Sequence, residues 1–290
     1  MARVLGVGVA TIDLIFSLPR YPVEDSEQRA QDLRRARGGN AANLLEVLAL
    51  LGHRCHWAGV LPADADGVWI EDRLREAGIG LSPACRRVAG ARAPLSSIWL
   101  GRASGSRTIV HYRDCPELGL ADLQRESPTA YDWIHFEGRQ PDETHGMLQW
   151  VRRQAAPPGL SLEVEKDRPG IERLLPLADL LLFSRAFARC RGFDRPEQLA
   201  AWARKRAPAA DLVLAWGDQG AWAWPAGGGT LFAPASPPPV LVDTLGAGDV
   251  FNAALVHGRL AGRPLDEALE SACRLAGRKC GQWGFQGLTE

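Results

Sequence analysis

The sequence predicts an α/β protein in which a mostly parallel sheet carries helices on both faces. Apolar runs typical of buried strands alternate with segments whose apolar residues recur at helical spacing. Two glycine turns, within residues 38–43 and 243–249, each lead directly into such a helix. A third observation sets a smaller unit apart: short strand patterns of exposed character cluster at residues 28–33, 95–100 and 107–112.

The elements of the main sheet follow from their periodicity. Residues 3–10 predict a buried strand, and residues 12–18 continue extended until Pro19. A hairpin turn is expected at residues 225–229, and the prolines at 237–239 prevent a helix before the last helices. Further strands are predicted at residues 56–60, 133–136, 160–164, 180–183 and 211–216, with helices at residues 43–51, 68–77 and 196–206.

The composition favours an enzyme that acts on a small molecule. The chain has 290 residues with 46% apolar content, which suffices for a sizeable core, and its 34 basic and 34 acidic residues give a net charge of zero. No broad basic field predicts a nucleic-acid or membrane partner. The six cysteines form no C-x-x-C pair, and we find neither a leader pattern nor an apolar run of membrane-spanning length. We therefore expect a cytoplasmic protein with reduced thiols.

The run Asp-Thr-Leu-Gly-Ala-Gly-Asp at residues 243–249 is the most informative segment. The apolar pattern beyond Asp249 predicts a helix, so the amides of Gly246, Ala247 and Gly248 lie at its positive end, where an anion binds. A carboxylate at an anion site suggests that Asp249 accepts a proton from a hydroxyl that attacks a phosphate. Helix capping by Asp249 is the alternative interpretation.

A second helix start, Gly-Gly-Asn-Ala-Ala-Asn at residues 38–43, adds two amide side chains. Asn40 and Asn43 are three residues apart, so they share a face of the first turn, and amides bind sugar hydroxyls well. Asn40 could instead be an ordinary N-cap. A dinucleotide site at Gly6-Val7-Gly8 is disfavoured because Thr11 stands where the third glycine belongs, and no P-loop motif occurs.

These two helix starts resemble the ribokinase-like (PfkB) carbohydrate kinase family, which has an early Gly-Gly-Asn and a late Asp-Thr-x-Gly-Ala-Gly-Asp. The likeness extends over nearly the whole chain and is greatest to the ketohexokinase branch, whose members phosphorylate fructose at its 1-hydroxyl. It is carried by residues 21–27, 37–41, 106–110, 133–139, 163–166, 243–249 and 277–281.

The resemblance implies a three-layer α/β/α sandwich with a β-sheet lid over a sugar pocket. The core would comprise residues 1–11, 40–92 and 114–290, and the lid residues 12–39 and 93–113. Two lids would clasp into a homodimer, which covers an otherwise open sheet. Asp25, at the charged tip of the lid, would reach the partner's sugar, although a merely solvated tip is the alternative.

The same resemblance assigns site residues. Asp13, Gly39, Asn40 and Asn43 would bind the sugar and Asp249 would be the base. Arg107 would contact phosphate and Arg139 would face the same crevice, with surface ion pairs as the alternative for both. The nucleotide would contact Ala215, Trp216, Gly217 and Asp218 as well as Gly246, Ala247 and Gly248, although Trp216 could be core packing alone.

The expected cofactors are ATP, as substrate, and Mg²⁺. The family's metal-linked Asn-x-x-Glu is replaced by Ser184-Arg185-Ala186-Phe187, as in ketohexokinase-like members. Glu163 and Glu165 are expected to face opposite sides of a strand, which leaves Glu165 as a water-mediated metal contact. The resemblance also implies K⁺ near the loops that flank the anion site. The alternatives are a fructose 6-hydroxyl kinase, a ribokinase, a nucleoside kinase or a non-catalytic sugar sensor.

Overall fold

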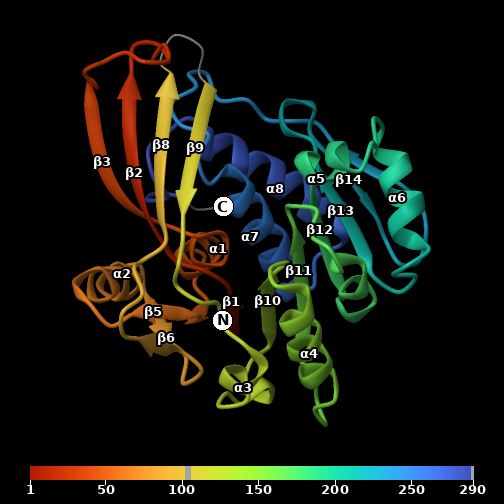
Figure 1. The fold of residues 1–290 in the computed structure, drawn as a ribbon. Helices are drawn as coiled ribbons and strands as arrows, with labels where there is room; N and C mark the ends of the chain where they lie inside the picture. Colours follow the sequence, from red (N-terminus) through yellow and green to blue (C-terminus); the bar gives the residue numbers. More distant parts are fainter. Residues whose placement is uncertain (102–105, 289–290) are drawn as a thin grey trace.

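The computed structural model describes residues 1–101 and 106–288. A nine-stranded sheet forms its centre, in the order β15-β14-β13-β12-β11-β10-β1-β4-β6, and is parallel from β13 to β6 (Figure 1). The two edge strands β14 and β15 are antiparallel. The strands are β1 (Arg3–Val7), β4 (Arg54–Ala58), β6 (Ile79–Leu81), β10 (Trp133–Glu137), β11 (Gly159–Val164), β12 (Leu180–Ser184), β13 (Asp211–Ala215), β14 (Ala221–Trp224) and β15 (Leu231–Ala233).

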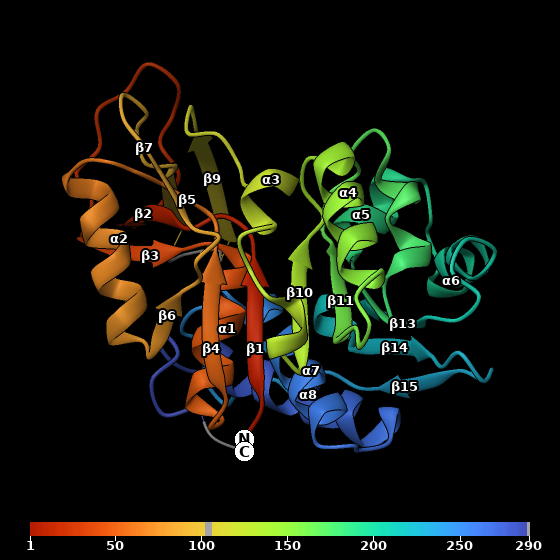
Figure 2. The same cartoon turned by 90° about the horizontal axis from the view of Figure 1, so that it is seen from below.

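Helices cover both faces of this sheet, and each face has its own apolar core (Figure 2). Successive side chains of a strand point to opposite faces, so Val4 of β1 enters one core and Leu5 the other. The first core is closed by α1 (Asn40–Leu50), α2 (Ala65–Glu76), α7 (Ala247–Leu260) and α8 (Leu265–Cys280), and the second by α3 (Leu120–Leu123), α4 (Pro141–Arg152), α5 (Arg185–Cys190) and α6 (Pro196–Arg204). The predicted α/β architecture is confirmed.

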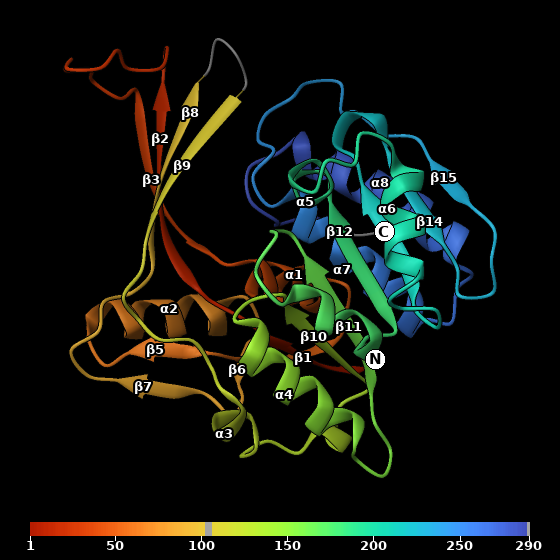
Figure 3. The same ribbon diagram turned by 45° about the vertical axis from the view of Figure 1, so that its right-hand side comes forward.

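A smaller four-stranded sheet projects beside the helices (Figure 3). Its strands are β2 (Thr11–Leu18), β3 (Asp32–Gly38), β8 (Leu95–Gly101) and β9 (Ser106–Tyr112), in the order β3-β2-β8-β9. The central pair β2 and β8 is parallel, and both outer pairs are antiparallel. Two further short strands, β5 (Val60–Pro62) and β7 (Arg86–Val88), form a separate parallel pair.

Several predicted elements have different bounds in the structure. The strand expected at residues 3–10 ends at Val7, because the chain there leaves the main sheet for the small one. The helix expected at residues 43–51 begins at Asn40. The strand expected at residues 28–33 instead spans Asp32–Gly38, where two arginines stack on tryptophans: the Arg34 guanidinium lies 3.6 Å from the Trp283 ring centroid and that of Arg35 4.3 Å from Trp69.

The hairpin agrees with expectation, and all six cysteines are free. The turn expected at residues 225–229 lies between the antiparallel strands β14 and β15. In the described part of the chain, no helix is both long enough and apolar enough to cross a bilayer.

Candidate active site

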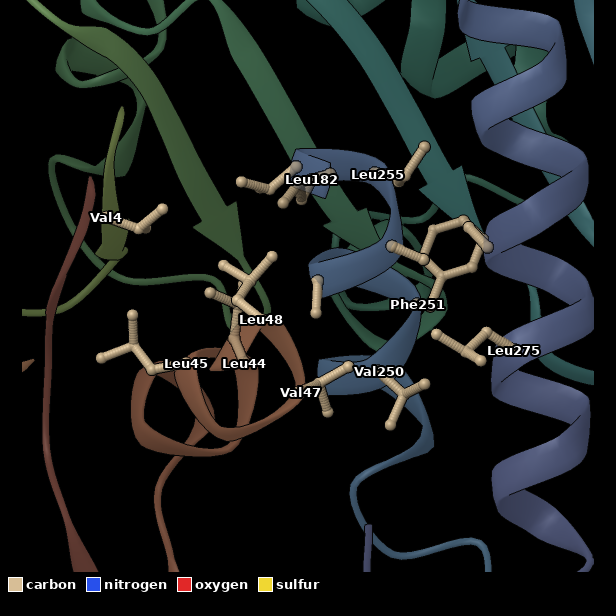
Figure 4. Packing of buried hydrophobic residues seen from close by; sticks show 14 of the residues in the cluster. Val4, Leu44, Leu45, Val47, Leu48, Leu182, Val250, Phe251, Leu255 and Leu275 are labelled. Atoms are coloured by element: carbon tan, nitrogen blue, oxygen red, sulfur yellow. The ribbon is translucent and has the colours of Figure 1, made fainter. Parts of the chain in front are cut away.

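The first turns of α1 and α7 lie side by side because the two helices share a core. Val47 and Leu48 of α1 pack in the same cluster as Val250 and Phe251 of α7, and all four are buried (Figure 4). Asn43 precedes Val47 by one turn on the same face, and Asp249 directly precedes Val250. The apolar contact therefore places the Asn43 and Asp249 side chains close together.

Each of these helices starts at a glycine that a side chain could not replace without strain. Gly39 has φ = 108°, and a Cβ there would lie 1.9 Å from the Val9 carbonyl oxygen. Gly246 has φ = 79°, in the left-handed region, and its Cβ would meet the Phe285 ring at 2.7 Å. These glycine turns lead directly into α1 and α7, as the sequence predicted.

Asp249 is the third residue of α7 and is 8% exposed. Its Oδ2 accepts a hydrogen bond of 2.7 Å from Asn43 Nδ2. Asn43 Oδ1 in turn accepts from the Arg37 guanidinium at 2.9 Å, and Arg37 forms a 2.5 Å ion pair with Glu46. Among the described residues no side chain caps the start of α7. Capping by Asp249 is thus not realised, and the first-turn amides remain directed at the turn.

The surroundings of Asp249 favour its protonated form. Burial, together with the Glu165 and Glu137 carboxylates, raises the pKa of Asp249 to about 7, although the hydrogen bond from Asn43 and the charge of Arg37 act in the opposite direction. A carboxyl group that titrates near neutral pH is matched to proton transfer.

A second group of carboxylates lies beside the first turn of α1. Glu163 is buried and accepts from Asn252 Nδ2 at 3.1 Å and from Asn40 Nδ2 at 3.1 Å, while Glu165 Oε2 lies 3.5 Å from the same Asn40 nitrogen. The expectation that Glu163 and Glu165 face opposite sides was wrong, because residues two apart along an extended chain share a side. Burial, then the charge of Asp249, raises the pKa of Glu163 well above its usual range.

Asn40 is therefore not the N-cap of α1. That position belongs to Gly39, and the Asn40 amide reaches across to the Glu163 and Glu165 carboxylates. The small polar pocket next to it lies at the carboxyl edge of β10 and β11, where ligands bind in open α/β sheets. It is lined by Asn40, Glu137, Gly138, Arg139, Glu163, Glu165 and Arg168.

Arg139 lies in this pocket but is held by acidic partners. Its Nε donates to Glu117 Oε1 at 2.9 Å, and a terminal nitrogen lies 3.8 Å from Glu137 Oε2. Glu137 in turn accepts from the Val9 and Ala41 amides at 3.2 and 2.9 Å. Arg139 therefore forms ion pairs at a partly buried position that faces the pocket.

Asp13 lies early in β2, under the turn that begins α1. It is 8% exposed and accepts from Thr11 Oγ1 at 2.8 Å. A Cβ on Gly38 would lie 2.1 Å from its Oδ2, which shows how closely the turn approaches the carboxylate. Burial raises the pKa of Asp13, and the hydrogen bonds of Thr11 and Ser96 oppose that shift.

Arg107 of β9 connects the small sheet with the glycine turn before α7. Its guanidinium donates to Thr244 Oγ1 at 2.7 Å, a hydrogen bond to a hydroxyl and not an ion pair. The expected nucleotide turn, Ala215 to Asp218, follows β13. The Trp216 ring is buried in the core against Trp222, while the Trp216 carbonyl and the Asp218 carboxylate accept from Arg185 at 3.3 and 3.1 Å.

Among the described contacts, none links Asp25 with the other predicted site residues of the same chain. It is exposed, with φ = 56°, in the segment that connects β2 and β3. This segment lies at the far end of the small sheet (Figure 3). Sequence reasoning also missed Arg37, Glu137 and Asn252 as residues of the site, and it set Glu163 aside in favour of Glu165. Asn252 could have been found, since it follows Asp249 by three residues on one helix face.

A family model described as pfkB family carbohydrate kinase matches residues 1–289. The chain belongs to this family. It is therefore a carbohydrate kinase, a phosphotransferase with an alcohol group as acceptor, as predicted. It is 35% identical to mouse (Mus musculus) ketohexokinase over 295 residues, which cover 99% of both chains.

Solved structures show the same ribokinase-like fold. A ribokinase from Giardia lamblia superposes with a TM-score of 0.84 at 16% identity, covering 100% of this chain and 97% of that one. Arabidopsis thaliana ribokinase in complex with ribose and ATP gives a TM-score of 0.78 at 21% identity, covering 98% and 94%. The ribokinase-like assignment made from the helix starts is thus confirmed.

Proposed function

We propose that this carbohydrate kinase transfers the γ-phosphate of ATP to a ketohexose, and specifically converts D-fructose to fructose 1-phosphate. The observation that carries the proposal is the Asp249 carboxylate in the first turn of α7, bound by Asn43 beside amides suited to an anion. Identity to mouse ketohexokinase along the full chain supports the ketohexose assignment. Fold neighbours described with ADP or with ribose and ATP support ATP as donor.

In this mechanism Asp249 orients the attacking hydroxyl and accepts its proton. The amides of Gly246, Ala247 and Gly248 stabilise charge on the phosphate oxygens, and an added side chain on Gly248 would meet no atom within 4 Å, so the approach to it is open. Arg107, anchored at Thr244, adds a positive charge on the small-sheet side. The turn Ala215 to Asp218 contacts the nucleotide through Ala215, Gly217 and the Asp218 carboxylate.

The sugar would lie between the small sheet and the start of α1. Asp13 accepts hydrogen bonds from two of its hydroxyls, and Gly39, Asn40 and Asn43 supply further polar contacts. Arg139 contributes from the adjoining pocket. Each side chain is already held by the bonds described above, so little rotamer freedom is lost on binding.

The carboxylate pocket fits Mg²⁺ that arrives with the nucleotide. Glu137, Glu163 and Glu165 line it together with Arg139 and Arg168. Burial, and after it the neighbouring carboxylates, raises the pKa of Glu137 and Glu163. Mg²⁺ takes oxygen ligands, commonly one or two carboxylates plus phosphate and water. Glu165, the more exposed of the pair on β11 and its extension, is the proposed contact. When bound, the ion would offset charge on the transferring phosphate.

The small sheet is proposed to act as a lid and dimer clasp, formed by residues 12–39 and 93–113. Strand alternation places Leu33 and Val110 on the face that points away from Asp13, and each is 56% exposed. A second copy would cover this face and bring its own Asp25 towards the sugar. Light scattering of the purified protein tests the dimer, and Leu33→Glu with Val110→Glu should give monomers.

Product analysis tests the substrate. ATP consumption is measured with fructose, ribose, tagatose, fructose 6-phosphate, 2-keto-3-deoxygluconate and adenosine, and NMR assigns the phosphorylated carbon. Fructose 1-phosphate as the main product supports the proposal. Phosphorylation of fructose at its 6-hydroxyl, or of ribose or adenosine, would keep the chemistry and replace the substrate. Sugar binding with no turnover on any of the six would favour a sensor.

A further inference from the structure

Lys279, near the end of α8, has a fully buried ammonium group. The residue is 0% exposed, and its Nζ donates to Asp243 Oδ2 at 2.7 Å, to the Asp243 carbonyl at 3.0 Å and to the Gln282 carbonyl at 3.4 Å. The same nitrogen lies 5.9 Å from the centroid of the Phe285 ring. Lysine is almost never fully buried without a partner, and here one carboxylate and two carbonyls supply it.

These oxygens come from the segment before α7 and from the segment after α8. Asp243 begins the glycine-rich run, and its Oδ1 accepts from the Leu245 amide at 2.9 Å. The amides of Val242 and Asp243 both donate to the Cys280 carbonyl. Phe285 packs under Gly246. Lys279 therefore joins the turn before α7 to the turn after α8, next to the proposed phosphate site.

The family resemblance places a monovalent cation in these same loops, and the residues present do not fit one. A monovalent cation needs a cluster of carboxylate and carbonyl oxygens, and the cluster formed here surrounds the Lys279 ammonium. Adding K⁺ would put two positive charges against one buried carboxylate, which is unfavourable where water cannot screen them.

We propose that the Lys279 ammonium is a built-in replacement for the monovalent cation, so that this kinase works without K⁺. Lys279 is a positioning residue: it fixes the Asp243 turn and thereby the amides at the start of α7. The inference rests on the kinase activity of the family and not on which sugar is phosphorylated.

The experiment compares potassium, sodium and tetramethylammonium chloride at equal ionic strength. Melting temperature and turnover of the full-length protein should be the same in all three salts. A melting temperature that is clearly higher in K⁺ than in Na⁺ or tetramethylammonium would overturn the proposal, and so would a turnover several-fold higher in K⁺. The melting readout needs no substrate, so it separates this failure from a wrong assignment of the sugar.

Lys279→Met sharpens the test because it leaves the oxygens and removes the cation. Its melting temperature and kcat should fall in tetramethylammonium and recover in part with K⁺ or NH₄⁺, with little change in the KM for the sugar. Lys205→Met, at an exposed lysine beyond α6, is the matched control and should behave as wild type. A folded Lys279→Met protein whose melting temperature ignores K⁺ and NH₄⁺ would contradict the proposal. If this variant does not fold, the comparison of the three salts with the wild-type protein tests the proposal by itself.

Discussion

Asn43 and Asp249 are 206 residues apart in the chain, and the Nδ2 of the first donates to the Oδ2 of the second at 2.7 Å. Each side chain projects from the first turn of a helix that a glycine starts, and the apolar packing of α1 on α7 aligns the two turns. The pair links the proposed sugar site to the proposed phosphate site. A substitution in either site should therefore change the position or the pKa of the Asp249 carboxylate.

Replacing Asn43 should weaken both binding and base function. Asn43→Ala removes the donor to Asp249 and the acceptor of Arg37, and a hydrogen bond to a charged group contributes about 1.5–3 kcal/mol. We expect kcat/KM to fall about 10–100-fold and the acid limb of the pH profile to move to higher pH, because this bond lowers the pKa of Asp249. Steady-state kinetics check it, with exposed Gln124→Ala as control. An unshifted profile would contradict the coupling.

Activity should depend on pH through Asp249. The base must be ionised, and burial raises its pKa to about 7, so kcat/KM should fall about tenfold per pH unit below that value. Measurements from about pH 5.5 to about pH 8.5 check this, with melting temperatures recorded over the same range. A rate that stays level down to about pH 5.5 would mean that no group with a pKa near neutrality is required.

The same shift predicts how stability varies with pH. The folded-state pKa of Asp249 lies above its ordinary 3.8, so the stabilisation from the protonated form is complete below about pH 4 and is lost as pH rises through about 7. Asp249→Asn should therefore melt higher than wild type at about pH 8, by a few degrees, and differ little at about pH 4. A difference in melting temperature between the variant and wild type that is larger at the lower pH would contradict a raised pKa of Asp249.

Arg107→Met should act mainly on the nucleotide. It removes the contact with Thr244 and a charge beside the glycine turn, so we expect the KM for ATP to rise about tenfold or more while the KM for the sugar changes little. Arg189→Met, at an exposed position on α5, is the control. An increase confined to the sugar KM would assign Arg107 to the other substrate.

Gly39→Ala should destabilise the fold through a steric clash. The new Cβ would combine a φ of 108° with a 1.9 Å approach to the Val9 carbonyl, whereas Gly228→Ala has a similar φ of 95° and nothing within 4 Å. A left-handed φ alone costs about 1–3 kcal/mol. Urea unfolding should show a larger loss at Gly39 than at Gly228, and equal losses would show that the turn relaxes freely.

The sequence was sufficient for the backbone of the site and insufficient for its side-chain partners. The starts of α1 and α7 were predictable, because glycines followed by apolar periodicity have few other structural solutions. Two hydrogen bonds of the site join distant parts of the chain: Glu163 with Asn252, 89 residues apart, and Lys279 with Asp243, 36 residues apart. Both depend on how distant elements pack, so the spacing of neighbouring residues does not predict them. The charged strand β3 was misplaced for the same reason, since Trp69 and Trp283 supply the surfaces for its arginines.

The most direct test of Asp249 as the base is to measure kcat and sugar affinity for Asp249→Asn. The amide can still accept from Asn43 but cannot take a proton, so sugar affinity should stay within several-fold while kcat falls by roughly 10²–10⁴. Asp194→Asn, at an exposed aspartate, should leave both values unchanged. Near-normal turnover in Asp249→Asn would remove Asp249 from the base role and contradict the mechanism.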